Sequence, residues 1–305
     1  MALITYTDRY LDWQLGEGHP TNPERARLAV EMLKTDKRMQ VREDWAGIDT
    51  PTEWIEYLQT VHTSDYLNRV LMDGICGEWA GASDTLARTA LTMFGGTQVL
   101  VDEYLSGSPH RVFFNPQGAK HHAQADHSSG FCVFNDMAAA ALRLADAGKR
   151  VVYVDWDAHA GDGVENILSD RDDIWTFSIH ERKLFPWTDN VCKTGQWNYP
   201  LEACAGNIEL IDAIDQVAEY IQETSPDVVL VACGADGHVD DPLSTLRYTL
   251  NGMDDAARRI ADSAAYVGAS AIIGGAGGYQ PHTVTPMHWH SVVKIFTDML
   301  EDSDS

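Results

Sequence analysis

The sequence predicts an α/β protein of three layers, in which helices cover both faces of one central, mainly parallel sheet. Short apolar runs alternate with amphipathic helical patterns along the 305 residues. Hydrophobic residues make up 44% of the chain and charged residues 22%, a balance typical of a folded protein with a large core. Strands that alternate with helices in this way favour a parallel sheet that is buried on both faces.

Six apolar runs predict strands, and six helical patterns predict helices. The strands are expected over Leu3–Tyr6, Arg111–Phe114, Arg150–Trp156, Ile174–Ile179, Asp227–Cys233 and Ser270–Gly274. The helices are expected over Pro23–Lys34, Thr85–Tyr104, Asp136–Asp146, Ile208–Glu223, Asp254–Tyr266 and His290–Met299. Asn22 is expected to cap the first helix, with Pro23 at its first position. We expect one domain over residues 1–300 and a frayed acidic tail over 301–305.

Acidic residues give the chain a formal net charge of −24. The 46 acids include 31 Asp and are spread along the chain, whereas Lys occurs only seven times. Such a surface repels nucleic acid and anionic membranes, so neither is an expected partner. The pattern favours a halophilic protein of an acidic proteome over the alternative, attraction of a cationic substrate.

The location and the assembly of the chain are less constrained. No apolar run approaches the roughly 18–20 residues of a membrane span, and the N-terminus lacks a signal-peptide pattern. The five cysteines are irregularly spaced without a CxxC, which favours reduced thiols. Together these features predict a cytoplasmic protein, and they leave open whether it forms a homo-oligomer.

The most informative segment is an apolar strand that runs into the carboxylates Asp155 and Asp157 and the imidazole of His159. Because side chains alternate along a strand, these three groups are expected on one face. They are costly to bury without a cation, and carboxylate and imidazole are ligand types of zinc. The alternative is a polar loop start.

Two further polar clusters follow apolar runs. Asp236 comes just after the run at 228–232, so it could supply another carboxylate to the same metal, although its Gly-Ala-Asp-Gly context also suits an ordinary turn. His121 and His122 are adjacent and suggest imidazoles that are each oriented by a carboxylate, as acid–base catalysis requires; a structural role is equally compatible.

A glycine-rich segment, Gly274–Gly278, is followed directly by Tyr279. Its backbone permits close approach of a ligand, and the Tyr279 hydroxyl could stabilise an oxyanion or simply pack in the core. A phosphate-binding loop is disfavoured, because neither Lys-Ser/Thr nor the Gly-x-Gly-x-x-Gly order is present.

These segments stand in the order of a known family. The matching segments are Gly16–Pro20, Pro23–Arg25, Val61–Tyr66, His121–Ala123, Ser129–Asp136, Asp155–Glu165, Gly234–Asp236, Asp241–Leu243 and Gly277–Tyr279. Through them the chain resembles the zinc-dependent deacetylase superfamily, which includes histone deacetylases, acetylpolyamine amidohydrolases and acetoin-utilisation proteins. The resemblance implies the arginase/deacetylase fold, with a sheet of about eight strands, and a single deacetylase-like catalytic domain.

The resemblance also implies a metal centre. Its ligands would be Asp157, His159 and Asp236. Zn²⁺ is the implied cofactor, with Fe²⁺ as the alternative, and open positions remain for water and the substrate carbonyl. A structural K⁺ is implied with less support, near Asp155, Asp157, His159, Ser178 and Ile179.

The remaining roles concern catalysis and substrate. By the resemblance, His122 is the general base and acid, His121 tunes the charge of the site, and Tyr279 polarises the carbonyl. The carboxylates that orient His121 and His122 would be Asp155 and Asp162, respectively. The implied substrate-binding residues are Gly130, Phe131, Phe185 and Leu243.

Three positions depart from the family pattern without removing a catalytic group. Lys120 precedes the histidine pair where a small residue is usual, and Ala160 replaces a frequent second histidine. The run Phe185–Trp187 departs from the usual sequence after its first two residues, at the rim of the implied tunnel.

The expected function is hydrolysis of an N-acetyl amide, with acetyl-lysine as the favoured substrate. Leu243 stands where polyamine-selective relatives carry Glu, which places acetylpolyamines and other small N-acyl amines second. A ureohydrolase would need a second Asp-x-Asp, but Gly234 and His238 flank Asp236. A non-catalytic acyl-amine binding protein would be expected to have lost ligand residues that are present here.

Overall fold

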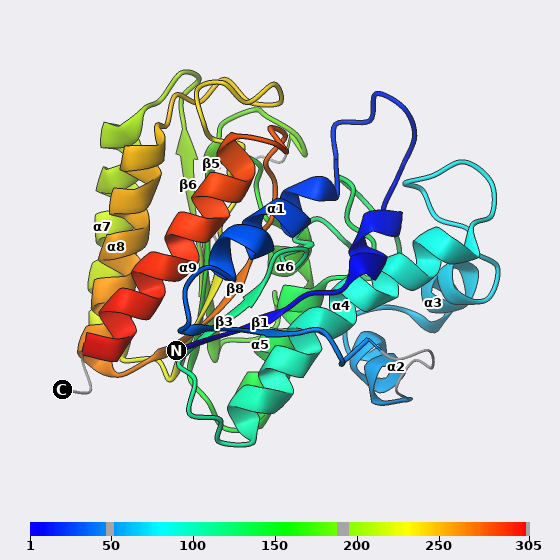
Figure 1. Ribbon diagram of the computed structural model, residues 1–305, viewed down its shortest axis with the longest axis horizontal. Helices are drawn as coiled ribbons and strands as arrows, with labels where there is room; N and C mark the ends of the chain where they lie inside the picture. The colour runs from blue at the N-terminus through cyan, green and yellow to red at the C-terminus, as the bar shows by residue number, and fades with distance from the viewer. Residues whose placement is uncertain (47–51, 188–194, 303–305) are drawn as a thin grey trace.

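One parallel sheet organises the protein. The computed structural model describes residues 1–46, 52–187 and 195–302, and this part of the chain contains an eight-stranded sheet of order β2-β1-β3-β8-β7-β4-β5-β6 (Figure 1). Every neighbouring pair of strands is parallel. The strands are β1 (Ala2–Thr5), β2 (Met39–Arg42), β3 (Val112–Asn115), β4 (Val151–Asp155), β5 (Ile174–Glu181), β6 (Gln196–Leu201), β7 (Val228–Ala232) and β8 (Ser270–Gly274). The predicted fold class is confirmed.

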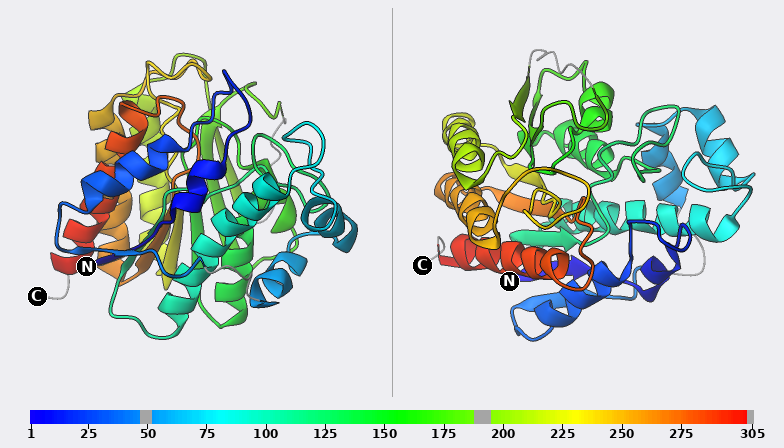
Figure 2. Two further views of the ribbon diagram at one scale, coloured as in Figure 1. Left: turned by 45° about the vertical axis from the view of Figure 1, so that its right-hand side comes forward. Right: turned by 90° about the horizontal axis from the view of Figure 1, so that it is seen from above.

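Helices cover both faces of the sheet. One layer consists of α1 (Glu24–Leu33), α7 (Asn207–Thr224), α8 (Leu250–Val267) and α9 (Val284–Asp302), which pack side by side (Figures 1 and 2). The other face carries α4 (Asp84–Leu105), α5 (Asp136–Asp146) and α6 (Asp162–Ile167). The short helices α2 (Thr52–Gln59) and α3 (Ser64–Leu71) lie beyond α4, and a 3₁₀ helix, η1, spans Asp8–Asp12. Right-handed crossovers account for this division, because connections that run in opposite directions along the sheet leave it on opposite faces.

The central strands explain why polar loops gather at one edge. The strands β4 and β7 are continuous apolar runs that are fully buried, as strands with helices on both faces must be. Their register pairs Asp155 with Ala232, Ala232 with Gly274, and Gly274 with Asn115. The loops that follow β3, β8, β7 and β4 therefore leave the sheet beside one another.

The expected elements are present with shifted ends, and several short ones were not expected. The edge strands β2 and β6 were missed, since edge strands are half-exposed and carry weak apolar patterns; β6 also contains Pro200, which an edge strand tolerates. The helices α2, α3 and α6 were missed because each has only six to eight residues. The expected tail is wrong at its start, because Glu301 and Asp302 belong to α9; residues 303–305 lie outside the described residues.

The first helix begins one residue later than expected. Pro23 is its N-cap and Glu24 its first residue. Asn22 still acts as a cap, since its side chain accepts a hydrogen bond from the Glu24 N–H at 2.9 Å.

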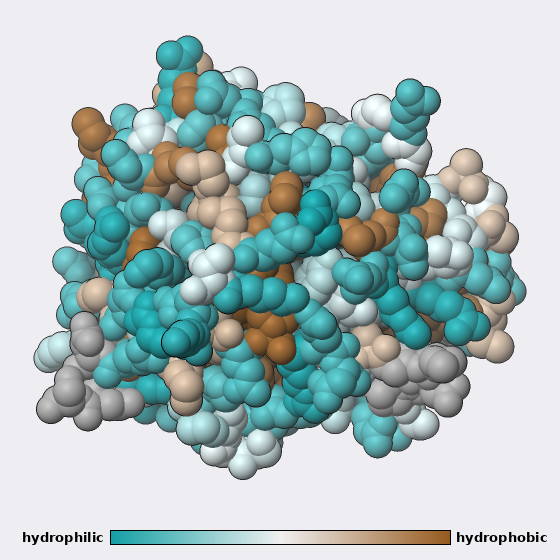
Figure 3. All heavy atoms as spheres, viewed as in Figure 1, coloured by the Kyte–Doolittle hydropathy of each residue, from teal (hydrophilic) through white to brown (hydrophobic). Residues whose placement is uncertain are grey.

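The surface agrees with the acidic composition. Hydrophilic residues cover most of the face shown in Figure 3, and apolar residues form only small areas on it. Among the described residues, no helix combines the length and the apolar character needed to span a bilayer.

The contact between α4 and α2 depends on a glycine in mid-helix. A Cβ at Gly95 would overlap the indole ring of Trp54, which is buried in the core. We expect Gly95→Ala to lower the free energy of unfolding by about 1–3 kcal/mol, because overpacking outweighs the helix propensity gained. Urea denaturation would measure the change. Thr85→Ala, at an exposed site of the same helix, is the control, and an equal or higher stability of Gly95→Ala would contradict this packing.

Candidate active site

The three predicted metal ligands converge at the carboxyl edge of the sheet. Asp157 and His159 lie on the loop after β4, and Asp236 lies on the loop after the neighbouring strand β7. The expectation that Asp155, Asp157 and His159 share one face of a strand is wrong beyond Asp155, because β4 ends at that residue. The loop that follows, and not strand geometry, turns Asp157 and His159 toward Asp236.

Their spacing suits one cation. His159 Nδ1 lies 3.0 Å from Asp157 Oδ1 and 2.9 Å from Asp236 Oδ2, and the three donor atoms fall within 4.8 Å of one another. All three side chains are buried. Burial raises the pKa of Asp236, and the charge of Asp157 raises it further. Two adjacent buried carboxylates are costly without a cation, and ligand atoms about 3 Å apart suit a metal about 2 Å from each. The residues present therefore fit a divalent metal.

Backbone N–H groups hold both carboxylates in place. Asp157 accepts hydrogen bonds from the N–H groups of His159 at 2.9 Å and Gly277 at 2.6 Å. Asp236 Oδ1 accepts one from Ala158 at 2.9 Å. Gly277 has to lack a side chain, because a Cβ there would overlap the carboxylates of both Asp157 and Asp236. Glycine at this position therefore allows the loop to pass close to both carboxylates.

The two adjacent histidines have separate carboxylate partners. His121 Nδ1 lies 2.7 Å from Asp155 Oδ2, and His122 Nδ1 lies 2.7 Å from Asp162 Oδ1. The Tyr153 hydroxyl also donates to Asp155, at 2.7 Å. The predicted pairing of each histidine with its carboxylate is the geometry observed.

The environment gives the two histidines opposite charge states. Burial disfavours the charged form of His121, but the charges of Asp155 and Asp157 outweigh it and raise its pKa to about 9. Burial, together with the neighbouring positive charge of His121, lowers the pKa of His122 to about 4. Asp162 acts in the opposite direction, but its effect is outweighed. At neutral pH, His121 is charged and His122 is neutral, so His122 can accept a proton.

Tyr279 faces the same centre. Burial, together with the charges of Asp236 and Asp157, holds the pKa of its hydroxyl well above the usual value, so the hydroxyl remains a donor. Its backbone N–H donates to Asp241 Oδ2 at 2.8 Å, and Asp241 Oδ1 accepts from the N–H of Leu243 at 3.0 Å. Asp241 therefore ties the tyrosine to the loop at the rim.

A cavity of about 390 Å³ opens above these groups. It is lined by His122, Gly130, Phe131, His159, Leu184, Phe185, Trp187, Leu243 and Tyr279. All four expected substrate-binding residues are among them. Gly130 needs to be glycine, since a Cβ there would collide with the His122 ring and lie 2.9 Å from Phe185 Cε1.

Several supporting residues were not predicted. Glu78 accepts a hydrogen bond from the Phe131 N–H at 2.8 Å, which fixes a cavity-wall residue that has a left-handed φ of 64°. Gln124 donates to Asp162 Oδ2 at 2.8 Å. Neither Glu78 nor Gln124 has a sequence signal. Asp241 lies in a matched motif that could have drawn attention to it.

The residues expected to bind potassium overlap the Asp157–His159–Asp236 cluster and continue into β5. Ser178 and Ile179 belong to β5, and Ser178 pairs with Asp155 of β4 in the sheet register. The Ser178 hydroxyl accepts a hydrogen bond from the Gly161 N–H at 3.3 Å. The arrangement brings the five expected residues to two adjacent strands and the loop between them, and K⁺ binding there stays a prediction.

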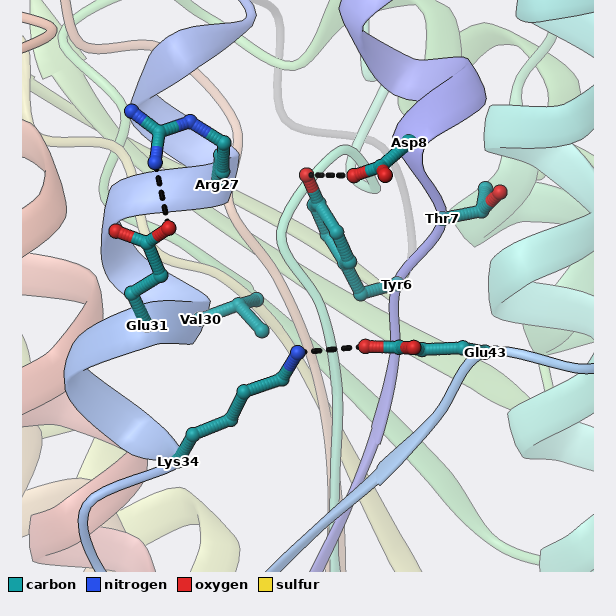
Figure 4. A pocket seen from close by; sticks show the side chains of 8 residues that line it. All are labelled: Tyr6, Thr7, Asp8, Arg27, Val30, Glu31, Lys34 and Glu43. Carbon is teal, nitrogen blue, oxygen red and sulfur yellow. Dashed lines mark hydrogen bonds and ion pairs between the residues drawn. The ribbon is translucent and has the colours of Figure 1, made fainter.

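A larger hollow of about 560 Å³ lies away from this chemistry, between α1 and the segment that joins β1 to η1 (Figure 4). Its charged groups satisfy one another. Lys34 pairs with Glu43 at 2.6 Å, Arg27 pairs with Glu31 at 2.5 Å, and the Tyr6 hydroxyl donates to Asp8 (Figure 4). Paired surface charges of this kind give no indication of a ligand.

The fold and the site together define an α/β protein with a centre of two carboxylates and one imidazole at the carboxyl edge of a parallel sheet. The family model described as Histone deacetylase domain matches residues 19–296. The chain belongs to this family, which confirms the predicted superfamily and the deacetylase class of function.

Individual relatives agree with this assignment. The acetoin utilization protein AcuC of Bacillus subtilis (strain 168) is 33% identical over 94% of this chain and 80% of its own length. A protein of Archaeoglobus fulgidus named "Probable deacetylase" is 27% identical over 84% of this chain and 75% of its own length. The crystal structure of the HDA15 HD domain superposes with a TM-score of 0.80 at 24% identity, covering 99% of this chain and 94% of that one. This structural match supports the fold alone.

A buried histidine outside the His121–His122 pair predicts a pH dependence of stability. His62 Nδ1 lies 2.9 Å from Gln124 O, and His62 Nε2 accepts from the Asn135 N–H at 3.0 Å. Burial lowers its pKa to about 4. Below pH ~6.5 the unfolded chain binds a proton that the folded protein does not, so stability falls as the pH drops toward 4.

Because of this one residue, we expect the free energy of unfolding of the wild-type protein to be about 2 kcal/mol lower at pH 5 than at pH 7. Chemical denaturation of wild type and His62→Gln at the two pH values would measure it. The variant should be less stable at pH 7 but lose less on acidification. Equal losses in the two proteins would contradict a neutral buried His62.

The carboxylate of Asp162, which lies behind His122, can be tested by substitution. Asp162→Asn keeps an acceptor for His122 Nδ1 but removes the charge that supports a positive imidazole. We expect kcat to fall by up to about 10²–10⁴-fold, because the expected acid–base role of His122 depends on this charge. The acidic limb of the kcat/KM profile should also move to lower pH, because Asp162 raises the pKa of His122. An unchanged profile with full activity would contradict this pairing.

Proposed function

We propose that the protein hydrolyses the N-acetyl amide of acetylated lysine side chains, with a divalent metal held by Asp157, His159 and Asp236. The observation that carries the proposal is the convergence of three groups on one cavity. A ligand set for a metal, a neutral histidine and a protonated tyrosine all face the same space. Zinc is the proposed metal and ferrous iron the alternative, since both accept carboxylate and imidazole ligands.

The metal, when bound, supplies the Lewis acidity that polarises the amide carbonyl and acidifies water. His122 removes a proton from the attacking water and delivers it to the leaving amine. Its neutral state at physiological pH makes it ready for the first of these transfers. Asp162 orients the ring and stabilises the positive charge that develops on it.

The other two residues control charge. His121, positive and paired with Asp155, keeps the pKa of His122 low, so that His122 can return the proton it has taken. The Tyr279 hydroxyl donates a hydrogen bond to the oxygen that becomes negative as water adds to the carbonyl. Because Asp241 holds the Tyr279 backbone, this donor is positioned before substrate binds.

The walls of the cavity fit a linear apolar chain that ends in an amide. Phe131 and Phe185 flank the cavity and suit the methylene stem of lysine, and the Gly130 carbonyl is the proposed acceptor for the amide N–H. At the rim, Leu243 offers no charge to a polyamine nitrogen. Acetyl-lysine is therefore the first choice of substrate, and acetylpolyamines or other small N-acyl amines are the second.

Hydrolysis of an acetyl-lysine peptide and of N-acetylputrescine, measured side by side, tests this proposal. The protein would be stripped with a chelator and restored with Zn²⁺ or Fe²⁺, at low and at molar salt. We expect metal-dependent turnover that favours the peptide. Turnover of N-acetylputrescine alone would identify acetylpolyamines as the substrate class. Turnover of both compounds by the metal-stripped protein would contradict the proposed role of the metal.

Tyr279→Phe separates binding from chemistry. The variant loses only a hydroxyl, so metal content and KM should stay close to wild type while kcat falls about 10²–10³-fold. Steady-state kinetics together with metal analysis would measure both effects. A kcat equal to that of wild type would exclude the proposed role of the hydroxyl.

A further inference from the structure

An exposed tryptophan lies at the cavity of the candidate site, and the proposed chemistry does not use it. Trp187 follows β5 on the segment that carries Leu184 and Phe185, and it lines the cavity together with them. It is 73% exposed, whereas Phe185 is only partly exposed. An apolar ring that stays in water contributes little to folding, so burial does not explain a tryptophan at this position.

The backbone at Trp187 is also unfavourable for a bulky residue. Its φ of 55° lies in the left-handed region, which large side chains rarely adopt. A turn fixes this conformation, because the Trp187 N–H donates to the Leu184 carbonyl at 2.8 Å. Glycine would adopt the same backbone with less strain. Strained residues of this kind cluster where ligands bind, which indicates a use for the exposed indole.

Three rings lead from the proposed base toward solvent. The ring centroids of His122 and Phe185 are 5.0 Å apart at an interplanar angle of 79°, and those of Phe185 and Trp187 are 5.2 Å apart at 83°. Both pairs therefore pack edge to face. Because the lysine stem is proposed to lie against Phe185, Trp187 is placed one ring further out, beside the residues that flank the acetyl-lysine.

The surroundings of Trp187 in the cavity are apolar. Leu184 and Leu243 line the cavity with it. Among the described residues, the lining contains no Asp, Glu, Lys or Arg, although the chain carries 46 acidic residues. A charged neighbour of the acetyl-lysine would thus meet no opposite charge in this lining. An indole beside two leucines suits a large apolar side chain, and an aromatic ring gains a specific ring contact in addition.

We propose that Trp187 is a specificity-determining residue that binds an aromatic side chain next to the acetyl-lysine of a peptide substrate. The inference rests on the proposed function and narrows its substrate class to peptide or protein segments in which acetyl-lysine has an aromatic neighbour. This contact lies outside the reacting groups, so it is made equally in the bound substrate and in the transition state. It therefore lowers KM and leaves kcat unchanged.

Kinetics on peptides that differ only beside the acetyl-lysine test this assignment. Phenylalanine, alanine, arginine or glutamate would flank it on both sides. For metal-loaded wild type, KM should be about 10-fold lower for the phenylalanine peptide than for the alanine peptide, at similar kcat. Trp187→Gly, which suits the left-handed backbone, should remove most of this difference, and Trp187→Phe should keep most of it. Tyr266→Ala, which removes a 78% exposed aromatic residue of α8, is the matched control and should behave as wild type.

Salt distinguishes an aromatic contact from the attraction of a cation. An indole ring also binds guanidinium groups, and the net charge of −24 attracts basic peptides at low salt. Molar salt screens that attraction but does not weaken the burial of apolar surface. The preference for the phenylalanine peptide should therefore persist in molar salt. A Trp187-dependent preference for the arginine peptide that disappears in molar salt would overturn the aromatic assignment.

Failure of the Trp187 contact and failure of the proposed function give different results. Binding of the same peptides, labelled with a fluorophore, to metal-stripped protein would be measured by anisotropy, which does not depend on turnover. Hydrolysis with equal KM values for the phenylalanine and alanine peptides in wild type would leave the proposed function standing and overturn the contact. Absence of hydrolysis, with tighter binding of the phenylalanine peptide to wild type than to Trp187→Gly, would overturn the proposed function and leave the contact.

Discussion

The structure depends on the cost of burying Asp157 and Asp236 beside one imidazole. Two carboxylates in an apolar interior need a cation, and the surrounding backbone is arranged to hold them ready for one. The N–H groups of His159, Ala158 and Gly277 take up the oxygen lone pairs, so neither carboxylate can turn away. The parallel sheet makes this possible, because β4, β7 and β8 end side by side and deliver their loops to one point.

Around this centre, burial and charge give two neighbouring histidines different pKa values. His121 and His122 are adjacent and each has an aspartate, yet their pKa values move in opposite directions. The difference arises because Asp155 is buried and Asp157 adds a second negative charge near His121, whereas His122 faces the positive His121 and the more exposed Asp162. The proposed acid–base role of His122 therefore depends on the arrangement of charges around it and not on the residue type.

The sequence predicts those features whose physical cause is local. The buried strands β4 and β7 are recognisable in the sequence as apolar runs, and the polar residues that follow them indicate where the site lies. The edge strands β2 and β6 have no such pattern, since half their surface faces solvent or loops. The role of Glu78 could not be predicted from the sequence either, because its hydrogen bond with the Phe131 N–H joins residues 53 positions apart. Lys120 was recognised as unusual, but only the three-dimensional structure reveals that it lacks an acid partner among the described residues.

In the proposed function, one divalent ion is held by Asp157, His159 and Asp236. Anomalous X-ray diffraction on crystals of the metal-loaded protein tests this most directly, because it locates the ion and identifies the element. We expect one ion per chain, bound by an oxygen of each aspartate and by Nδ1 of His159. Two ions sharing the site, or an ion bound elsewhere with these three residues free, would contradict it.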